Sequence, residues 1–290
     1  MNGDLLRTLP DHVLTTKVFT YFGFKDYALT GCVSQYSQAH WQTANRRKPL
    51  PLHVPEDCKT LKEAVERVEQ DPRITTIVLG KGEHVVEMVT DNWGQDHNHL
   101  KINSALTIVG RPDVPKEKIV VVGGIEFKNG IQGNCHLQHL TLRQAKRNGV
   151  WGRSSFTMED VLVEQCRGDG VTASGTGVVG RCTNVEVRQC GGSGVSATNG
   201  ASITLIGAKT TVHHNCTKGD SDQYGLQVCG SSSSTIIQLV SPLTREQVSI
   251  DNGGGRNWGA YDADLNQIKT IDAPVISSSS AHVGETKSTH

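Results

Sequence analysis

Three segments of the stretch Asn134–Val195 repeat one pattern: CHLQHLTLRQAKRNGV (135–150), FTMEDVLVEQCRGDGV (156–171) and GRCTNVEVRQCGGSGV (180–195). In each copy apolar residues alternate with polar ones, and a Gly-Val pair closes the copy. The glycines of these pairs, Gly149, Gly170 and Gly194, follow one another at intervals of 21 and 24 residues. A period of this length, with short alternating runs and glycine corners, indicates a solenoid of stacked repeats.

Alternation at period two predicts strands, because every second side chain of a strand lies on the same face. Three short strands per repeat make one coil, so we expect a mainly β fold, a right-handed parallel β-helix. Stacking the coils places equivalent residues in columns about 5 Å apart. Two apolar columns are expected to form the core: Leu140/Val161/Val185 and Leu142/Val163/Val187.

The composition of the 290 residues suits this fold. There are 31 glycines against nine prolines, and aromatic residues make up only 5%, as expected of many tight corners around a narrow core. Lys+Arg and Asp+Glu both total 29, so the charge balance gives no reason to expect a nucleic acid or an anionic membrane as partner.

The N-terminal sequence MNGDLLRTLPDHV has charges and a proline where a secretory signal peptide needs an apolar core, and no apolar run is long enough to span a membrane. We therefore expect a soluble, intracellular protein of the cytoplasm, in the host cytoplasm if the chain is viral. In that reducing compartment the eight cysteines are expected to stay free, and the Asn215-Cys216-Thr217 sequon to stay unmodified.

Residues 1–48 lie outside the repeat and show helical amphipathicity, with apolar residues at three- and four-residue steps. The segment LPDHVLTTKVFTYFGFKDYALTGCVSQYSQAHW resembles an F-box: a Leu-Pro opening, an apolar helix ending near Phe22, then Phe-Lys-Asp and a second helix. Two positions depart from that family, with Ser34 where cysteine is usual and Tyr36 where tryptophan is usual. The alternative is a small helical extension packed on the solenoid.

Residues 49–275 are expected to form the β-helix, beginning with a strand at 51–54. A capping helix is expected at 60–70, with Thr60 as its N-cap and Glu63 completing a capping box. The run TLKEAVERVEQDPRITTIVLGKGEH resembles the start of pectin-lyase-like β-helices, in which such a helix covers the open first coil. The strand 119–122 is apolar on both faces and should be covered by a loop or by the N-terminal unit. Residues 276–290 are polar and serine-rich, and we expect a disordered tail.

Three further columns carry polar residues or cysteine. The column Ala145, Cys166, Cys190 and Asn215 is expected to point inward as a stack of small side chains rather than to form a metal or redox site. A second column of alternating charge is expected to be exposed and to support strand register. If the third column faces inward, it forms an amide ladder. The second column is Arg143/Glu164/Arg188 and the third is Gln144/Gln165/Gln189.

Two clusters could carry enzyme chemistry. One is His213 and His214 with Asp220 and Asp222, although consecutive residues of a strand point to opposite faces, which argues against a joint site. The other is the loop Asp91–His99, with Asp91, Asp96, His97 and His99. For both clusters, a solvated loop is the favoured interpretation. In the three clear coils, no column carries an acid in every coil, and the fold resemblance alone does not imply activity.

The F-box resemblance implies a non-catalytic substrate receptor of a cullin-type ubiquitin ligase, with the β-helix as target-binding platform. A Skp1-like adaptor and an unknown protein target would be its partners; we expect a monomer with no catalytic residue, no cofactor and no metal. Two alternatives stay open: a carbohydrate-active, pectin-lyase-like enzyme acting on polyuronides as lyase, hydrolase or epimerase, and an inert structural or diverged β-helix protein. The expected adaptor-binding residues are Leu9, Pro10, Val13, Leu14, Val18 and Phe19.

Overall fold

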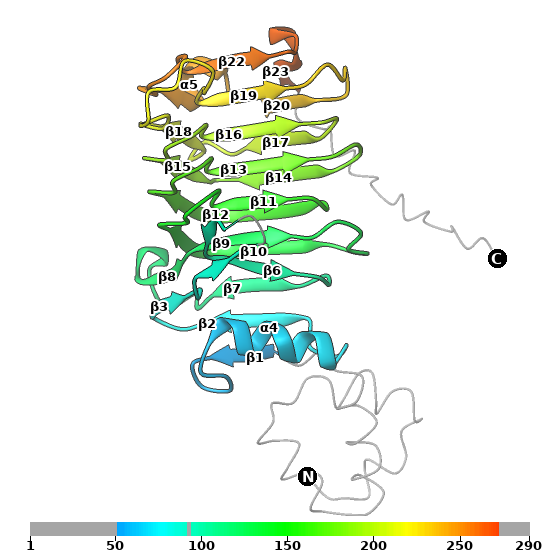
Figure 1. Cartoon of the computed structure of the whole chain (residues 1–290), viewed down its shortest axis with the longest axis vertical. Coiled ribbons are helices and arrows are strands. Elements are labelled where there is room, and N and C mark those ends of the chain that lie inside the picture. The colour runs from blue at the N-terminus through cyan, green and yellow to red at the C-terminus, as the bar shows by residue number, and fades with distance from the viewer. Residues whose placement is uncertain (1–50, 92–93, 273–290) are drawn as a thin grey trace, which may run out of the picture.

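The computed structural model describes residues 51–91 and 94–272, and Figure 1 shows them as a stack of β coils along the long axis. The expected F-box-like unit with its adaptor-binding residues, and the expected tail, lie outside the described residues. The described part is mainly β, with long parallel sheets and two short α-helices. This arrangement is that of a parallel β-helix-like fold.

The first face of the stack is a parallel sheet in the order β1-β2-β7-β10-β12-β14-β17-β20-β23. Neighbouring strands in this order come from successive coils, so each coil adds one rung. The strands are β1 (Pro51–Val54), β2 (Thr76–Leu79), β7 (Thr107–Gly110), β10 (Cys135–Arg143), β12 (Phe156–Glu164), β14 (Val179–Thr183), β17 (Ser202–Ile206), β20 (Ile236–Val240) and β23 (Ile268–Ile271).

The second face branches from the first, because β10 and β12 each continue across a corner and pair again. At that corner His139 and Asp160 take left-handed backbone conformations, with φ of 52° and 51°. The remaining strands of the second face are β3 (Gly82–Val85), β8 (Ile119–Val122), β15 (Glu186–Arg188), β18 (Thr211–His213) and β21 (Ser249–Ile250).

The third face is a separate seven-stranded parallel sheet, in the order β22-β19-β16-β13-β11-β9-β6. Figure 1 shows its strands alongside those of the first face in each coil. They are β6 (His99–Ile102), β9 (Gly124–Phe127), β11 (Val150–Gly152), β13 (Val171–Ser174), β16 (Val195–Thr198), β19 (Leu226–Cys229) and β22 (Trp258–Tyr261).

The register confirms the predicted core columns. Leu140 pairs with Val161, and Leu142 with Val163, which pairs in turn with Val187. All five side chains are fully buried. Burying aliphatic side chains in every coil is the main stabilising contribution to such a stack.

The Gly-Val pairs have one steric cause in every coil. A Cβ on Gly149 would meet Val163 Cγ1 at 2.4 Å, one on Gly170 would meet Val187 Cγ1 at 2.2 Å, and one on Gly194 would meet Val212 Cγ1 at 2.3 Å. The backbone at this corner lies directly against the core valine of a neighbouring strand. Only glycine leaves room for that contact.

The glutamine column does not form an inward ladder. Gln144, Gln165 and Gln189 are exposed and occupy the corner that follows the second face, with φ of 58°, 54° and 54°. The single amide contact in the column joins Gln165 Nε2 to Gln189 Oε1 at 3.4 Å. An outward corner with positive φ suits a flexible polar residue, so solvent takes the place of the ladder.

The first coil is covered by helix α4 (Leu61–Gln70), as the sequence predicts. Its buried stripe is Leu61, Ala64, Val65 and Val68. The Thr60 side chain accepts from the Glu63 amide at 3.1 Å, which confirms the N-cap. The predicted capping box is wrong. The Glu63 carboxylate accepts from the Lys59 amide at 2.9 Å, one residue before the amide of the N-cap Thr60.

Residues 111–118, including the short 3₁₀ helix η4 (Lys116–Lys118), cover the apolar outer face of β8, where Val120 is buried. Thr141 Oγ1 donates to the Lys116 carbonyl, and the Lys116 ammonium lies 2.7 Å from Asp160 Oδ1. This loop is the predicted cover of the 119–122 strand. The remaining elements are β4 (Val89–Thr90), β5 (Asp96–His97), α5 (Arg245–Val248) and η5 (Leu265–Gln267).

Candidate functional site

One corner of the stack, between the second and third faces, carries a column of cations. The Arg167 amide donates to Ala145 O at 2.8 Å, just before Lys146, and the Gly191 amide donates to Cys166 O at 2.7 Å. The Lys218 amide donates to Gly191 O at 3.3 Å. These bonds stack Lys146, Arg167, Gly191 and Lys218 on successive coils, which lie about 4.8 Å apart.

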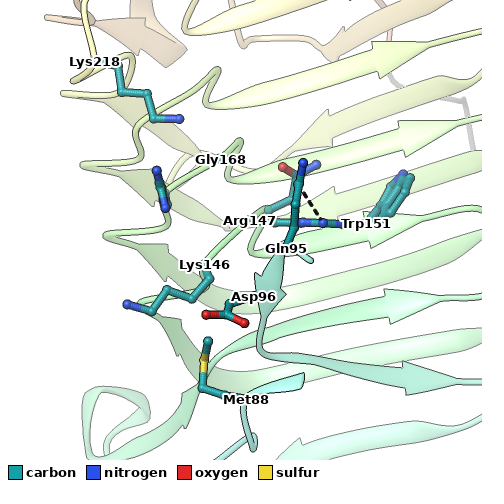
Figure 2. Close-up of a pocket in the computed structure, with 10 residues that line it drawn as sticks. Met88, Gln95, Asp96, Lys146, Arg147, Trp151, Gly168 and Lys218 are labelled. Carbon is teal, nitrogen blue, oxygen red and sulfur yellow. Dashed lines mark hydrogen bonds between the residues drawn. The ribbon is translucent and has the colours of Figure 1, made fainter. Parts of the chain in front are cut away.

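The column lies along a groove of about 950 Å³. Figure 2 shows Lys146 and Lys218 at different heights along this groove, with Trp151 on the third face. Four of its residues are cationic and one is acidic, so the groove has a positive potential. It is lined by Met88, Gln95, Asp96, Lys146, Arg147, Asn148, Trp151, Arg167, Gly168 and Lys218.

The cations of the groove fall into two kinds. Arg147 is held in place, since its Nη2 lies 2.5 Å from Asp91 Oδ2 and 3.0 Å from Gln95 Oε1. The side chains of Lys146, Arg167 and Lys218 are exposed and make no hydrogen bond or ion pair with any described residue. Three charged heads are therefore available to a ligand.

A hydrogen-bonded network lies beside the groove, under Asn148. The Ser193 amide donates to Asp169 Oδ1 at 2.8 Å, Thr172 Oγ1 donates to Asp169 Oδ2 at 3.1 Å, and the Asp169 amide donates to Asn148 Oδ1 at 3.1 Å. Burial raises the pKa of the Asp169 carboxyl, against the lowering effect of the Ser193 and Thr172 donors and the Lys218 charge. The network holds the groove-lining backbone in position.

Trp151 is half-buried on the outer surface of β11. The guanidinium of Arg153 lies 4.8 Å from the centre of its ring, a cation–π contact that fixes the indole orientation. An aromatic surface therefore adjoins the cationic column.

The hairpin β4–β5 forms one wall of the groove, and it corrects the interpretation of Asp91–His99 as a solvated loop. His97 and His99 are buried, and Asp91 is partly buried against Arg147. Asp96 is exposed and accepts from Thr90 Oγ1 at 2.7 Å. The four side chains do not converge on one point, because each has its own neighbours.

Burial lowers the pKa of both histidines of this hairpin, so they favour the neutral imidazole. His99 Nε2 is 2.7 Å from the Asn148 carbonyl and donates to it. His97 Nδ1 is buried and has no hydrogen-bond partner among the described residues. His97 also lines a smaller cavity of about 260 Å³ beside α4.

The second predicted cluster is only partly brought together. His213 Nδ1 and His214 Nδ1 are 2.7 Å apart, which overturns the expectation that they point to opposite faces. The reason is that His214 has left the strand and occupies a corner with φ of 54°. Asp220 and Asp222 are exposed and have no side-chain hydrogen bond or ion pair with any described residue. Within the described part of the chain, no three His, Cys, Asp or Glu side chains form a group that could hold a metal ion.

The charge column is more buried than predicted. Glu164 is only 4% exposed, with Arg143 Nε at 2.8 Å on one side and Arg188 Nη2 at 2.8 Å on the other. The column continues through Glu186, which accepts from Arg188, to His213 Nε2 at 3.3 Å. The column still pairs opposite charges on neighbouring strands, as expected for a column that supports strand register. The two arginine side chains shield the central Glu164 carboxylate from water.

The small-residue column points inward, as predicted. Cys166 and Cys190 are buried, free thiols, and the contact between them together with burial raises the pKa of Cys190 well above its usual value. Asn215 takes the next rung and is 1% exposed. It accepts from the Cys190 amide and donates to the Val187 and His213 carbonyls. These contacts make the column structural, and they bury the sequon nitrogen.

Sequence reasoning missed the groove. The repeat period alone places Lys146 and Arg167 in one column, since they follow Ala145 and Cys166 directly. Lys218 was not predictable in this way, because the chain makes an extra turn at Cys216, where φ is 59°.

Comparisons with known proteins add nothing to the fold assignment. No protein-family model and no curated protein matches the sequence. One solved structure is similar, the A-module of the Azotobacter vinelandii mannuronan C-5 epimerase AlgE6, at 12% identity over 77% of this chain and 99% of that chain, with a TM-score of 0.22. The fold assignment rests on the strand pairing. Among residues 51–91 and 94–272 no helix is long and apolar enough to cross a membrane.

Proposed function

We propose that this protein is a non-catalytic receptor whose β-helix holds a target through the cationic groove. The observation that carries the proposal is the set of three exposed cations, Lys146, Arg167 and Lys218, whose side chains line a groove and make no hydrogen bond or ion pair with any described residue. Unpaired like charges held side by side repel one another. An anionic partner bound in the groove would offset this repulsion.

The side chains around the groove support binding rather than bond cleavage. A glycosidase of the usual kind needs two carboxyl groups facing each other across the scissile bond, about 5–10 Å apart. The lining has one acid, Asp96, and its carboxylate accepts from Thr90. Asp169 is committed to the Ser193 and Thr172 donors.

The part of the proposal that concerns adaptor binding rests on the resemblance of residues 1–48 to an F-box. In a receptor of a cullin-type ubiquitin ligase, these residues would dock on a Skp1-like adaptor, and the β-helix would present the target to the ubiquitin-charged enzyme. Such a receptor would act by proximity alone, and the ubiquitin-charged enzyme would carry out the transfer. The adaptor face would be built from Leu9, Pro10, Val13, Leu14, Val18 and Phe19.

A pull-down of the full chain with a purified Skp1-like adaptor tests this part of the proposal. Wild type should bind, and the double variant Leu9→Ala/Pro10→Ala should bind at least tenfold more weakly. The matched control is Lys209→Gln/Lys269→Gln, which alters two exposed cations of the β-helix and should leave binding unchanged. An adaptor that does not bind wild type contradicts the receptor assignment.

A polyuronide assay tests the enzyme alternative. We expect no change in the reducing ends, unsaturation or epimer content of polymannuronate or polygalacturonate, with or without calcium. Turnover that disappears in Asp96→Asn or Asp169→Asn would replace the receptor assignment with a carbohydrate-active one.

We also propose that the coils wind in a right-handed sense. The support is general: parallel strands of one sheet joined by crossover connections are right-handed in about 98% of cases. A crystal structure with anomalous phasing would test the sense of winding directly.

A further inference from the structure

We propose that the cationic groove binds an extended acidic segment of a partner protein, with an apolar side chain of that segment packed on the groove rim. The inference rests on the proposed receptor function and names the chemistry of its target. The groove residues that carry the inference are Lys146, Arg167, Lys218, Trp151 and Met88.

The cationic side chains are spaced for an extended chain. Lys146 and Arg167 are on neighbouring coils, Lys218 is two coils further on, and the column spans about 14 Å at 4.8 Å per coil. An extended peptide advances about 3.3 Å per residue, so four or five residues cover that length. Two or three carboxylates of such a segment can reach the three charged heads.

The rung between Arg167 and Lys218 is the buried Gly191. A Cβ at Gly191 would meet Arg167 O at 2.3 Å and the Lys218 Cε at 3.1 Å. No side chain fits at this rung, because the Arg167 backbone and the Lys218 side chain occupy the space. The Lys218 side chain therefore packs over Gly191, on the side of Arg167, and the two cations lie along one line of the groove.

The rim carries apolar surface that an acidic polysaccharide would not use. Met88 is 50% exposed at the edge of the groove, and the half-buried Trp151 adds an indole surface to the same lining. Methionine adapts its shape to different apolar partners and is common at peptide-binding surfaces. An acidic peptide with a Leu, Ile or Phe side chain matches both the charge and this rim, whereas a polyuronide matches the charge alone.

Fluorescence polarisation with a defined probe tests the inference. The probe is a fluorescein-labelled octapeptide in which Leu residues separate Glu-Asp pairs, and two matched peptides replace Leu with Ser or the acids with Lys. We expect the probe to bind wild type, the Ser peptide to bind at least threefold more weakly, and the Lys peptide not to bind. Binding should weaken as salt rises, because the charges lie in an open groove.

Variants locate the site on the protein. Lys146→Gln/Arg167→Gln/Lys218→Gln should weaken probe binding at least tenfold, and Met88→Ser should weaken the Leu peptide but not the Ser peptide. The control is Arg181→Gln/Lys209→Gln/Lys269→Gln, which removes the same charge from exposed cations outside the groove and should leave affinity unchanged. Equal thermal midpoints establish that the variants are folded.

Several results would overturn the inference: no probe binding to wild type, equal loss in the groove and control variants, or tighter binding of oligogalacturonate than of the Leu peptide. The adaptor pull-down separates this inference from the receptor proposal, because the groove variants leave residues 1–48 intact. Probe binding without adaptor binding would keep the groove and remove the receptor. Adaptor binding without probe binding would do the reverse.

Discussion

Glu164 and Arg188 face each other from neighbouring coils, with Glu164 Oε2 accepting from Arg188 Nε at 3.0 Å and from Nη2 at 2.8 Å. The second carboxylate oxygen accepts from Arg143 on the preceding coil. One carboxylate thus joins three successive coils. The hydrogen bond to Glu164 and the charge of Glu186 raise the pKa of Arg188 although burial lowers it.

Removing this central charge should destabilise the stack. In Glu164→Gln, the two guanidinium groups lose their shared anion, and we expect the free energy of unfolding to fall by about 2 kcal/mol. This is below the cost of breaking a fully buried pair, because the arginine side chains are 29% and 35% exposed and water screens them. Urea unfolding followed by circular dichroism measures the change.

Glu159→Gln is the matched control, since Glu159 lies on the same strand and is exposed with no ion pair to any described residue. It should change stability by less than about 0.5 kcal/mol. Equal effects of the two variants on the free energy of unfolding would show that the ion pairs of Glu164 do not stabilise the stack.

The Gly-Val corner should not tolerate a methyl group. Gly170→Ala places a Cβ 2.2 Å from Val187 Cγ1 and 2.6 Å from the Gly194 carbonyl, so two coils must separate. We expect a loss of about 2–3 kcal/mol in the free energy of unfolding, measured with urea. Val187→Ala removes the atom that the new Cβ would meet. The double variant should therefore lose less free energy of unfolding than the sum of the two single variants. A loss equal to that sum would contradict this contact.

The Asn215 rung should be more sensitive than its exposed neighbours. Its side chain satisfies the Cys190 amide and the Val187 and His213 carbonyls inside the stack. In Asn215→Ala these groups lose their partners, and we expect a loss of about 2–4 kcal/mol in the free energy of unfolding. Thr217→Ala removes an exposed side chain two residues further on and should change stability by less than about 0.5 kcal/mol.

The docking of residues 111–118 should depend on pH through His139. Burial opposes the charged imidazole, but hydrogen bonds from Nδ1 to Asp160 and from Nε2 to the Val114 carbonyl outweigh it and raise the pKa of His139. Because the pKa of His139 is higher in the folded than in the unfolded protein, its protonation stabilises the fold. This contribution is fully present below the unfolded pKa of about 6.5 and is lost as the pH rises through the folded pKa. The pKa of Asp160 is lowered, because hydrogen bonds and charges from Lys116 and His139 outweigh burial, so its contribution is lost at acid pH.

The thermal midpoint of wild type and of His139→Asn, measured from pH 5 to pH 9, tests this dependence. Asparagine is chosen because Asn184 occupies the same corner column, with φ of 52°. The variant should lose stability at pH 5.5, and its difference from wild type should shrink as pH rises. A difference that is constant over this range would contradict a charged His139.

The sequence predicts the parts of the fold that follow from the repeat pattern or from a local capping motif. It does not predict features that depend on side chains from neighbouring coils. Alternation and period predict the core columns and the place of Asn215, and the capping pattern predicts Thr60 as the N-cap of α4. Glu164 was expected at the surface because its position is outward, but arginine side chains from the two adjacent coils cover it. Such cover depends on side-chain conformation, which the repeat pattern does not contain.

The same limit applies to the candidate sites. Period two predicts opposite directions for His213 and His214, and a single corner residue with positive φ removes that rule. The wall of the groove is a hairpin joined to the stack by the ion pair between Asp91 and Arg147, 56 residues apart in the chain. Contacts of this range are set by how the coils stack, so neither the groove nor the buried histidines follow from the local sequence.

The unpartnered His97 nitrogen gives the last prediction. Nδ1 is buried without a hydrogen-bond partner among the described residues, and a buried polar atom in that condition costs about 1–3 kcal/mol. His97→Leu removes the polar atom and keeps an apolar side chain, so the free energy of unfolding should rise by about 1 kcal/mol or stay unchanged. His99→Leu is the matched comparison on the neighbouring strand β6: it deprives the Asn148 carbonyl of its donor and should lower stability by about 1–2 kcal/mol. If His97→Leu is as destabilising as His99→Leu in urea unfolding, then Nδ1 has a partner such as an ordered water, and the cavity beside α4 is hydrated.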